Sequence, residues 1–150
     1  MSQLIATCLP TIVRIAGLGQ LVLIVASLAI PSILGWKEET AKLRPLTRQV
    51  FWTYAGYIWA TNLAFGLLSA LAPHWLLDQS GLSATVTSFI AVYWIARLII
   101  QFTCFDRHDI EGGTPPALLI GGESALVSLF VLLALVYTSA ALWNFGVIAA

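Results

Sequence analysis

Long apolar stretches alternate with short polar segments along this chain. Between positions 49 and 105 the only charged residues are Asp78 and Arg97, and from position 112 onward the only one is Glu123. These stretches have neither the polar side of a surface helix nor the period-two alternation of a barrel strand. A helix of about 20 mainly apolar residues crosses about 30 Å of hydrocarbon with every backbone polar group satisfied internally. The pattern therefore predicts membrane-spanning helices.

Four stretches are long enough to span a membrane, and we place them at 11–34, 50–72, 84–105 and 117–143. Turn-forming and charged residues fill the breaks between them. Helices joined by short connections pack as antiparallel neighbours. The predicted fold is therefore all-α: a single domain over 1–150, built as an integral membrane bundle of four transmembrane helices. Pro10 is expected to break the chain ahead of the first span.

Composition narrows the functional classes. Hydrophobic residues make up 59% of the chain and charged residues 9%, whereas a soluble domain carries about 25% charged residues. This disfavours a disordered chain and an ordinary water-soluble enzyme. Seven basic residues balance seven acidic ones, so no basic field exists to attract a nucleic acid.

Basic residues gather in the connections after the first and third spans. They are Lys37, Lys42, Arg44 and Arg48 in the first and Arg107 in the other. Lys and Arg near helix ends favour the cytoplasmic side. We therefore expect a multi-pass protein of the bacterial inner membrane with both termini on the outer side. The connection at 36–49 could also bind anionic lipid headgroups or a cytoplasmic partner, although orientation alone would explain its charges.

An ionisable group inside a span is costly, so it usually faces the bundle interior or a wet cavity. Arg97 lies in the third span, with Gln101 and Tyr93 one turn away on either side. Its Cα lies about 12 Å below the predicted membrane boundary and that of Glu123, in the fourth span, about 9 Å. We therefore predict that Arg97 and Glu123 pair. The pair either locks two helices together or lines a polar pathway for a substrate or proton, and the sequence leaves both open.

Small and amide residues predict a close contact between the first two spans. Asn62, near the centre of the second span, lies on a stripe with Gly66 and Ser69, while Gly17 and Gln20 occupy neighbouring turns of the first. Small residues let helix backbones approach closely, and amides can hydrogen-bond across the contact. We expect a tight hairpin packed through these residues.

Chemistry-bearing motifs are scarce. Asp106, His108 and Asp109 could hold a divalent metal weakly, but a solvated turn is the better explanation, since charge runs are usually exposed. We therefore expect neither a metal site nor a cofactor. The sequence has no glycine-rich phosphate loop and no HExxH, GxSxG or paired CxxC motif. These observations favour a protein that is not an enzyme.

Three functional hypotheses remain. The first is a small membrane protein that acts through helix packing, as an oligomer or as an accessory subunit of a membrane complex, with an inward-facing Arg97–Glu123 cluster. The second is a small transporter or channel lined by Arg97, Gln101, Asn62 and Glu123. The third is a redox module that binds a quinone or haem among the aromatic residues of the second and third spans. The partners expected are the lipid bilayer and either a second copy or another membrane subunit.

Overall fold

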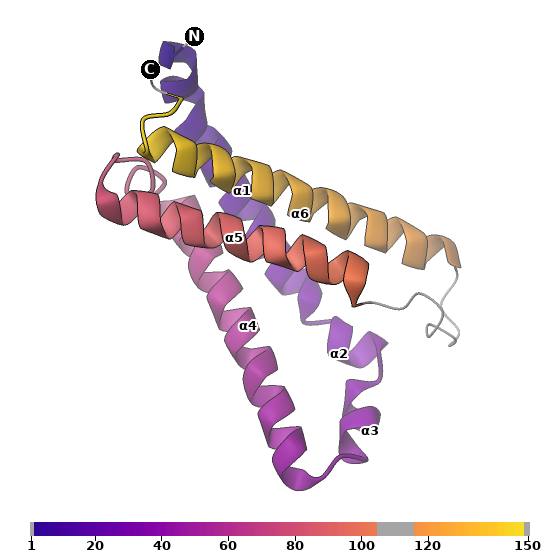
Figure 1. Ribbon diagram of the computed structural model, residues 1–150. Helices are drawn as coiled ribbons and strands as arrows, with labels where there is room; N and C mark the ends of the chain where they lie inside the picture. Colours follow the sequence, from indigo (N-terminus) through magenta and orange to yellow (C-terminus); the bar gives the residue numbers. More distant parts are fainter. Residues whose placement is uncertain (1, 105–115, 149–150) are drawn as a thin grey trace. The chain divides into compact units, whose positions relative to one another are not determined.

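The computed structural model of the chain describes residues 2–104 and 116–148, with side chains described for 7–104 and 124–148. All regular structure in these residues is α-helical, as predicted. In chain order the helices are α1 (Ser2–Ser27), α2 (Ile30–Ile33), α3 (Trp36–Ala41), α4 (Pro45–Leu71), α5 (Gly81–Thr103) and α6 (Pro116–Asn144) (Figure 1).

Three helical segments of the described chain are long and apolar enough to cross a membrane. They are Thr7–Ile33, Gly81–Thr103 and Ser124–Asn144. α4 has 27 residues and covers the predicted span 50–72 except for its last residue, but it is less apolar than these three. The reason is that hydroxyl and amide side chains, among them Tyr54, Tyr57 and Asn62, interrupt its apolar residues.

The N-terminal helix differs from the prediction at Pro10. The expected break there is wrong, because α1 continues through Pro10 without interruption. A proline removes one helical hydrogen bond, and helices with apolar surroundings tolerate that loss when neighbouring bonds are kept. The helix instead ends at Ser27, and α2 follows after two turn residues, with Pro31 in its first turn.

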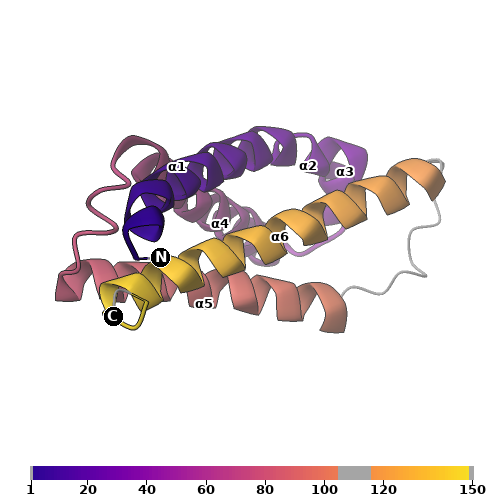
Figure 2. The ribbon, with the colours of Figure 1, turned by 90° about the horizontal axis from the view of Figure 1, so that it is seen from above.

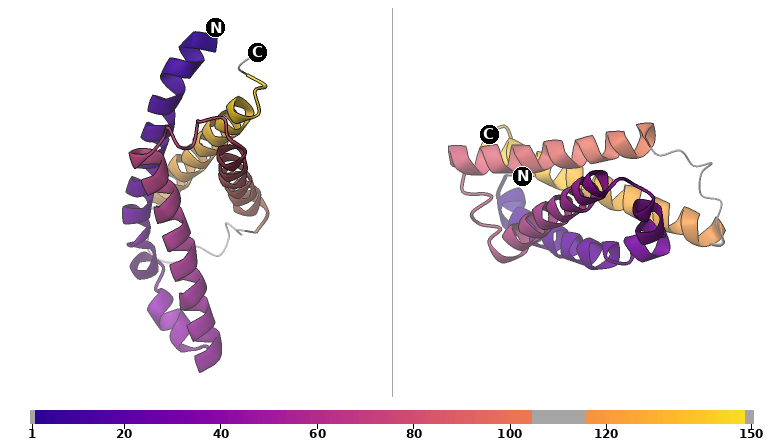
Figure 3. Two further views of the ribbon diagram at one scale, coloured as in Figure 1. Left: turned by 90° about the vertical axis from the view of Figure 1, so that its left-hand side faces the viewer. Right: turned by 90° about the horizontal axis from the view of Figure 1, so that it is seen from below.

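The described chain divides into two compact units. One contains residues 14–73, and the other contains residues 74 onward together with the chain up to Val13. In the first unit, α2 and α3 connect α1 to α4 (Figure 3). Gly35 makes the corner before α3 with a left-handed φ of 59°, a conformation that glycine adopts without a Cβ clash.

α5 and α6 form the core of the second unit and lie side by side (Figure 2). They are antiparallel, because Thr87 contacts Asn144 while Trp94, further along α5, packs on Phe130, which is earlier in α6. Their buried residues recur every three or four positions, as in a coiled-coil seam. On α5 these are Ser83, Ala84, Thr87, Ile90, Ala91 and Trp94, and on α6 they are Phe130, Leu133, Ala134, Tyr137, Ala140, Ala141 and Asn144.

Candidate functional site

Arg97 is the one charged residue within α5, and it lies beside an aromatic ring of α6. Its guanidinium carbon is 5.8 Å from the ring centroid of Phe130. Phe130 is buried, while Arg97 is half-buried. A guanidinium over an aromatic face gains about 0.5–1 kcal/mol when exposed and about 2 kcal/mol when desolvated. Phe130 therefore helps to hold this cation at the α5–α6 contact.

Two further aromatic residues of α5 extend this cluster. The Trp94 ring centroid lies 5.3 Å from that of Phe130, and Tyr93 meets Trp94 edge-on at 5.4 Å. Trp94 is only 1% exposed. Its indole N–H has no hydrogen-bond acceptor among the described residues, and leaving such a donor buried without a partner costs about 1–3 kcal/mol.

We call Arg97, Tyr93, Trp94 and Phe130 the Arg97 cluster, and it contains several hydrogen-bond donors. Arg97 also has no hydrogen bond or ion pair within the described part of the chain. A guanidinium and an indole N–H can only donate. A group that pairs with either of them has to be an acceptor, such as a carboxylate or a carbonyl oxygen.

The other residues predicted for this cluster lie in different places. Gln101 is half-buried, one turn beyond Arg97 on α5. The side chain of Glu123 lies outside the described residues. Along α6, Glu123 precedes Phe130 by seven residues, which is about 10 Å of helical rise. Asn62 belongs to the other unit, on α4, and its amide nitrogen donates to the Ile58 carbonyl oxygen at 2.8 Å.

The residues predicted for helix packing lie at a close contact between α1 and α4. A Cβ added at Gly17 would lie 2.5 Å from the backbone nitrogen of Ala70 and 2.8 Å from the Cβ of Ser69. A Cβ at Gly66 would lie 3.0 Å from Leu21 and 3.3 Å from Gln20. At position 17 the obstacle is backbone, which cannot move aside as a flexible side chain can. Only glycine fits there without a shift of one helix.

A polar network near the ends of α5 and α6 was not anticipated from the sequence. The Asn144 amide nitrogen donates to the Leu76 carbonyl oxygen at 2.8 Å and to Thr87 Oγ1 at 3.1 Å, and its Oδ1 accepts from the Gln79 N–H at 3.2 Å. Thr87 Oγ1 itself donates to the Ser83 carbonyl oxygen at 2.6 Å. Asn144 thus joins the segment before α5 to both helices. The sequence clue to this network was an asparagine at the end of an apolar helix, but an asparagine at that position is equally typical of a residue that ends a helix.

A carboxylate stands at the start of α5, outside the spans. Asp78 Oδ1 accepts from the Ser80 N–H at 2.9 Å, and Ser80 Oγ accepts from the Ser83 N–H at 3.1 Å as the helix N-cap. Hydrogen bonding to the Ser80 side chain, and then to its backbone, holds the pKa of Asp78 below its ordinary value. The ionised form of Asp78 is therefore part of the helix start.

The weak metal candidates Asp106, His108 and Asp109 lie outside the described residues. Within those residues, no group of three His, Cys, Asp or Glu side chains could hold a metal ion. Cys8 and Cys104 are free and exposed.

The comparisons with known proteins give no family for this chain. No protein-family model, no curated protein and no solved structure matches it. The functional conclusion therefore depends on the chain's own residues.

Proposed function

We propose that this protein is an integral membrane protein with four spans that acts through helix packing, as an oligomer or as an accessory subunit of a membrane complex. The observation that carries the proposal is the exposure of large apolar side chains along the candidate spans. Val22 of α1 is 69% exposed, Phe89 of α5 is 61% and Leu132 of α6 is 59%. Contiguous apolar faces of this kind are unfavourable in water and are the normal surface of a helix in lipid.

α4 is the proposed fourth span. Its 27 residues would extend about 40 Å as a helix, which exceeds the thickness of the hydrocarbon layer. Its lower hydropathy fits a helix that packs on a neighbour through Gly66 and Ser69, since small and polar residues mark such contacts in membranes. With α4 included, the chain forms one transmembrane domain over 1–150.

The proposed orientation puts the basic connections in the cytoplasm and both termini outside, in a bacterial inner membrane. Cys8 and Cys104 can test it, because both thiols are exposed. Each is kept in turn while the other is changed to serine, and intact cells are treated with a thiol reagent that cannot cross the inner membrane. Cys8 should react in intact cells, whereas Cys104 should react only after permeabilisation. The reverse pattern would show that the orientation is wrong.

The oligomer or subunit role is tested on the purified protein. Light scattering after gentle detergent extraction measures the mass of the protein in the complex, and the purified material shows whether another membrane subunit comes with it. A mass above the 16.2 kDa of one chain, or a co-purified subunit, is expected. A stable monomer that binds neither partner nor ligand would overturn the proposal.

A transporter or channel is the second candidate, and one observation favours it. Arg97 and Trp94 present donors that no described residue accepts from, as expected where a polar substrate passes. Gln101 and Glu123, which belong to the same unit, would line the rest of the path. The transport hypothesis is tested by measuring the flux of small anions into vesicles that contain either the unchanged protein or the Arg97→Ala variant. No flux in the unchanged protein, or equal flux in the variant, would remove it.

A further inference from the structure

Two arginines and a tryptophan form a row along the start of α4. Arg44 is the N-cap residue of α4, Arg48 follows one turn later and Trp52 one turn after that. Arg48 and Trp52, both inside the helix and four residues apart, lie on the same side of it, and Arg44 lies just before its first turn. The Arg48 N–H donates to the Arg44 carbonyl oxygen at 3.0 Å, which confirms that this turn is helical. All three side chains are exposed.

The two arginines have no counter-charge in the described chain. Neither forms an ion pair there, and the first turn of α4 contains no acidic residue. Like charges four residues apart repel each other, and cations are unfavourable at the start of a helix. This row opposes the stability of its own helix unless an anion lies beside it.

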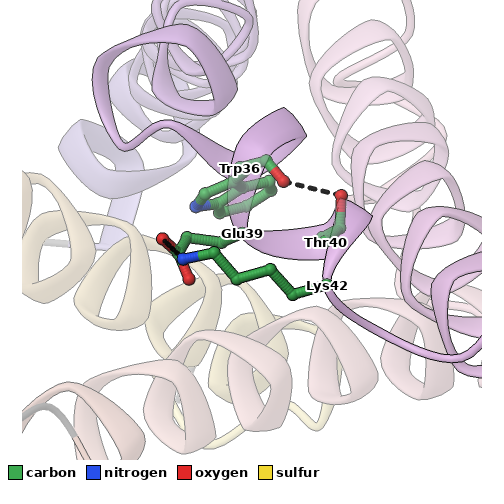
Figure 4. A network of polar contacts seen from close by, with 4 residues as sticks. All are labelled: Trp36, Glu39, Thr40 and Lys42. Carbon is green, nitrogen blue, oxygen red and sulfur yellow. Dashed lines mark hydrogen bonds and ion pairs between the residues drawn. The ribbon is translucent and has the colours of Figure 1, made fainter.

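Lys42 shows the contrast within the same connector. Its Nζ lies 2.6 Å from Glu39 Oε1, in an ion pair at the end of α3 (Figure 4). The charge of Lys42 is therefore already compensated by the chain, while those of Arg44 and Arg48 are not.

An aromatic cluster lies next to this row. The Trp36 ring centroid lies 5.2 Å from that of Phe51 and 6.2 Å from that of Trp52, both edge-on. The Thr40 hydroxyl donates to the Trp36 carbonyl oxygen at 2.6 Å and closes the turn of α3 (Figure 4). α3 is thus packed against the beginning of α4. Indole rings prefer the level of the lipid headgroups. In the proposed membrane location, Arg48, one turn before Trp52, would therefore lie at the level of the lipid phosphates.

We propose that Arg44 and Arg48 bind the phosphate of an anionic phospholipid, with Trp36 and Trp52 at the boundary of its acyl chains. Planar guanidinium groups bind phosphate oxygens in a bidentate manner. The inference rests on the proposed membrane location and adds a specific lipid class and site to it. It holds for either orientation of the connector.

Tryptophan fluorescence in vesicles tests the site. The full chain is reconstituted in phosphatidylcholine that contains a small fraction of either brominated phosphatidylglycerol or brominated phosphatidylcholine, since bromine quenches indoles nearby. Stronger quenching by the anionic lipid is expected, and Trp36→Phe and Trp52→Phe identify the reporting rings. Arg44→Gln and Arg48→Gln should each lower the preference about fivefold. Lys42→Gln, which removes a compensated charge, is the matched control and should keep most of it.

The outcomes separate the two proposals. A chain that does not float with vesicles overturns the membrane location and the lipid site together. A chain that floats but is quenched equally by both lipids overturns the lipid site alone, as does an equal effect of Arg44→Gln and Lys42→Gln. If inorganic phosphate removes the preference at constant ionic strength, the row binds free phosphate and the lipid site is wrong. Circular dichroism of each variant must show unchanged helix content.

Discussion

Of two glycines in the first unit, one is tightly packed and the other is not. Comparing their alanine variants therefore distinguishes an effect of packing from an effect of helix propensity. Gly17 faces the backbone of α4, whereas Gly56, on α4, has no heavy atom within 4 Å of an added Cβ. Gly17→Ala should therefore lower the free energy of unfolding by about 1–3 kcal/mol, the usual cost of overpacking. Denaturant titration in detergent, followed by circular dichroism, measures this change.

Gly56→Ala is the control for that experiment. The same added methyl group meets nothing there, and alanine favours a helix over glycine by about 1 kcal/mol. Its free energy of unfolding should be unchanged or slightly raised. If both variants behaved alike, the close contact at Gly17 would not be the cause.

Asn144 gives a second prediction for a single residue. Asn144→Leu keeps the branched shape of the side chain but removes the bonds to Leu76, Thr87 and Gln79. We expect the free energy of unfolding to fall by about 1–3 kcal/mol, because buried groups are left without partners. Gln79 has a left-handed φ of 59°, which is unfavourable for a residue with a Cβ. Its amide hydrogen should exchange faster in the variant, as measured by hydrogen–deuterium exchange.

Thr85→Ala is the comparison for Asn144→Leu. The Thr85 hydroxyl is exposed and donates only to the Gly81 carbonyl oxygen of its own helix, at 2.8 Å. Removing it should leave exchange at Gln79 unchanged. Equal effects of the two variants would mean that the network does not hold this segment in place.

At the scale of elements, we expect the start of α5 to respond to pH through Asp78. Its pKa in the folded protein is lowered, chiefly by the Ser80 hydroxyl and N–H, so it lies below the ordinary value of about 3.9. The stabilisation is therefore complete above about pH 4 and is lost as pH falls through the folded-state pKa. In Asp78→Asn this part of the acid dependence should be absent. Unfolding curves recorded on either side of pH 4 compare the two proteins, and identical curves would contradict the role of the carboxylate.

The apolar stretches predicted where the long helices lie more closely than they predicted the residues at which these helices begin and end. The predicted span 84–105 corresponds to α5, at Gly81–Thr103, within three residues at each end. α4 begins at Pro45, five residues before the predicted span. A helix can continue beyond the hydrocarbon layer wherever its backbone forms helical hydrogen bonds. Hydropathy locates the membrane and does not locate helix ends, which depend on caps and prolines.

The sequence predicted the features of the candidate site that depend on one helix, but not the contacts between helices. The cost of an ionisable group in lipid was enough to select Arg97. Its contact with Phe130 depends on the register between α5 and α6, which the spacing within either helix does not determine. The same holds for Asn144, whose partners lie 57 to 68 residues away in sequence.

At the scale of the whole molecule, the two units use different means of packing. α1 and α4 approach through glycine at 17 and 66, while α5 and α6 combine small residues with the rings of Trp94 and Phe130. Without a hydrophobic driving force between helices in lipid, close backbone contact and polar bonds must supply the stability. Large apolar residues outside these contacts would then face lipid or a partner helix.

The predicted pair of Arg97 and Glu123 is the last test at this scale. With Arg97 beside Phe130 and Glu123 about 10 Å earlier along α6 by helical rise, the two side chains must extend toward each other to meet. A double-mutant cycle with Arg97→Ala and Glu123→Ala should give a coupling of about 0.6 kcal/mol, the average for polar contacts in membranes. Arg97→Ala and Phe130→Leu should be coupled as well, because the ring holds the cation. Coupling to Phe130 without coupling to Glu123 would show that Arg97 is held by the ring and does not pair with Glu123.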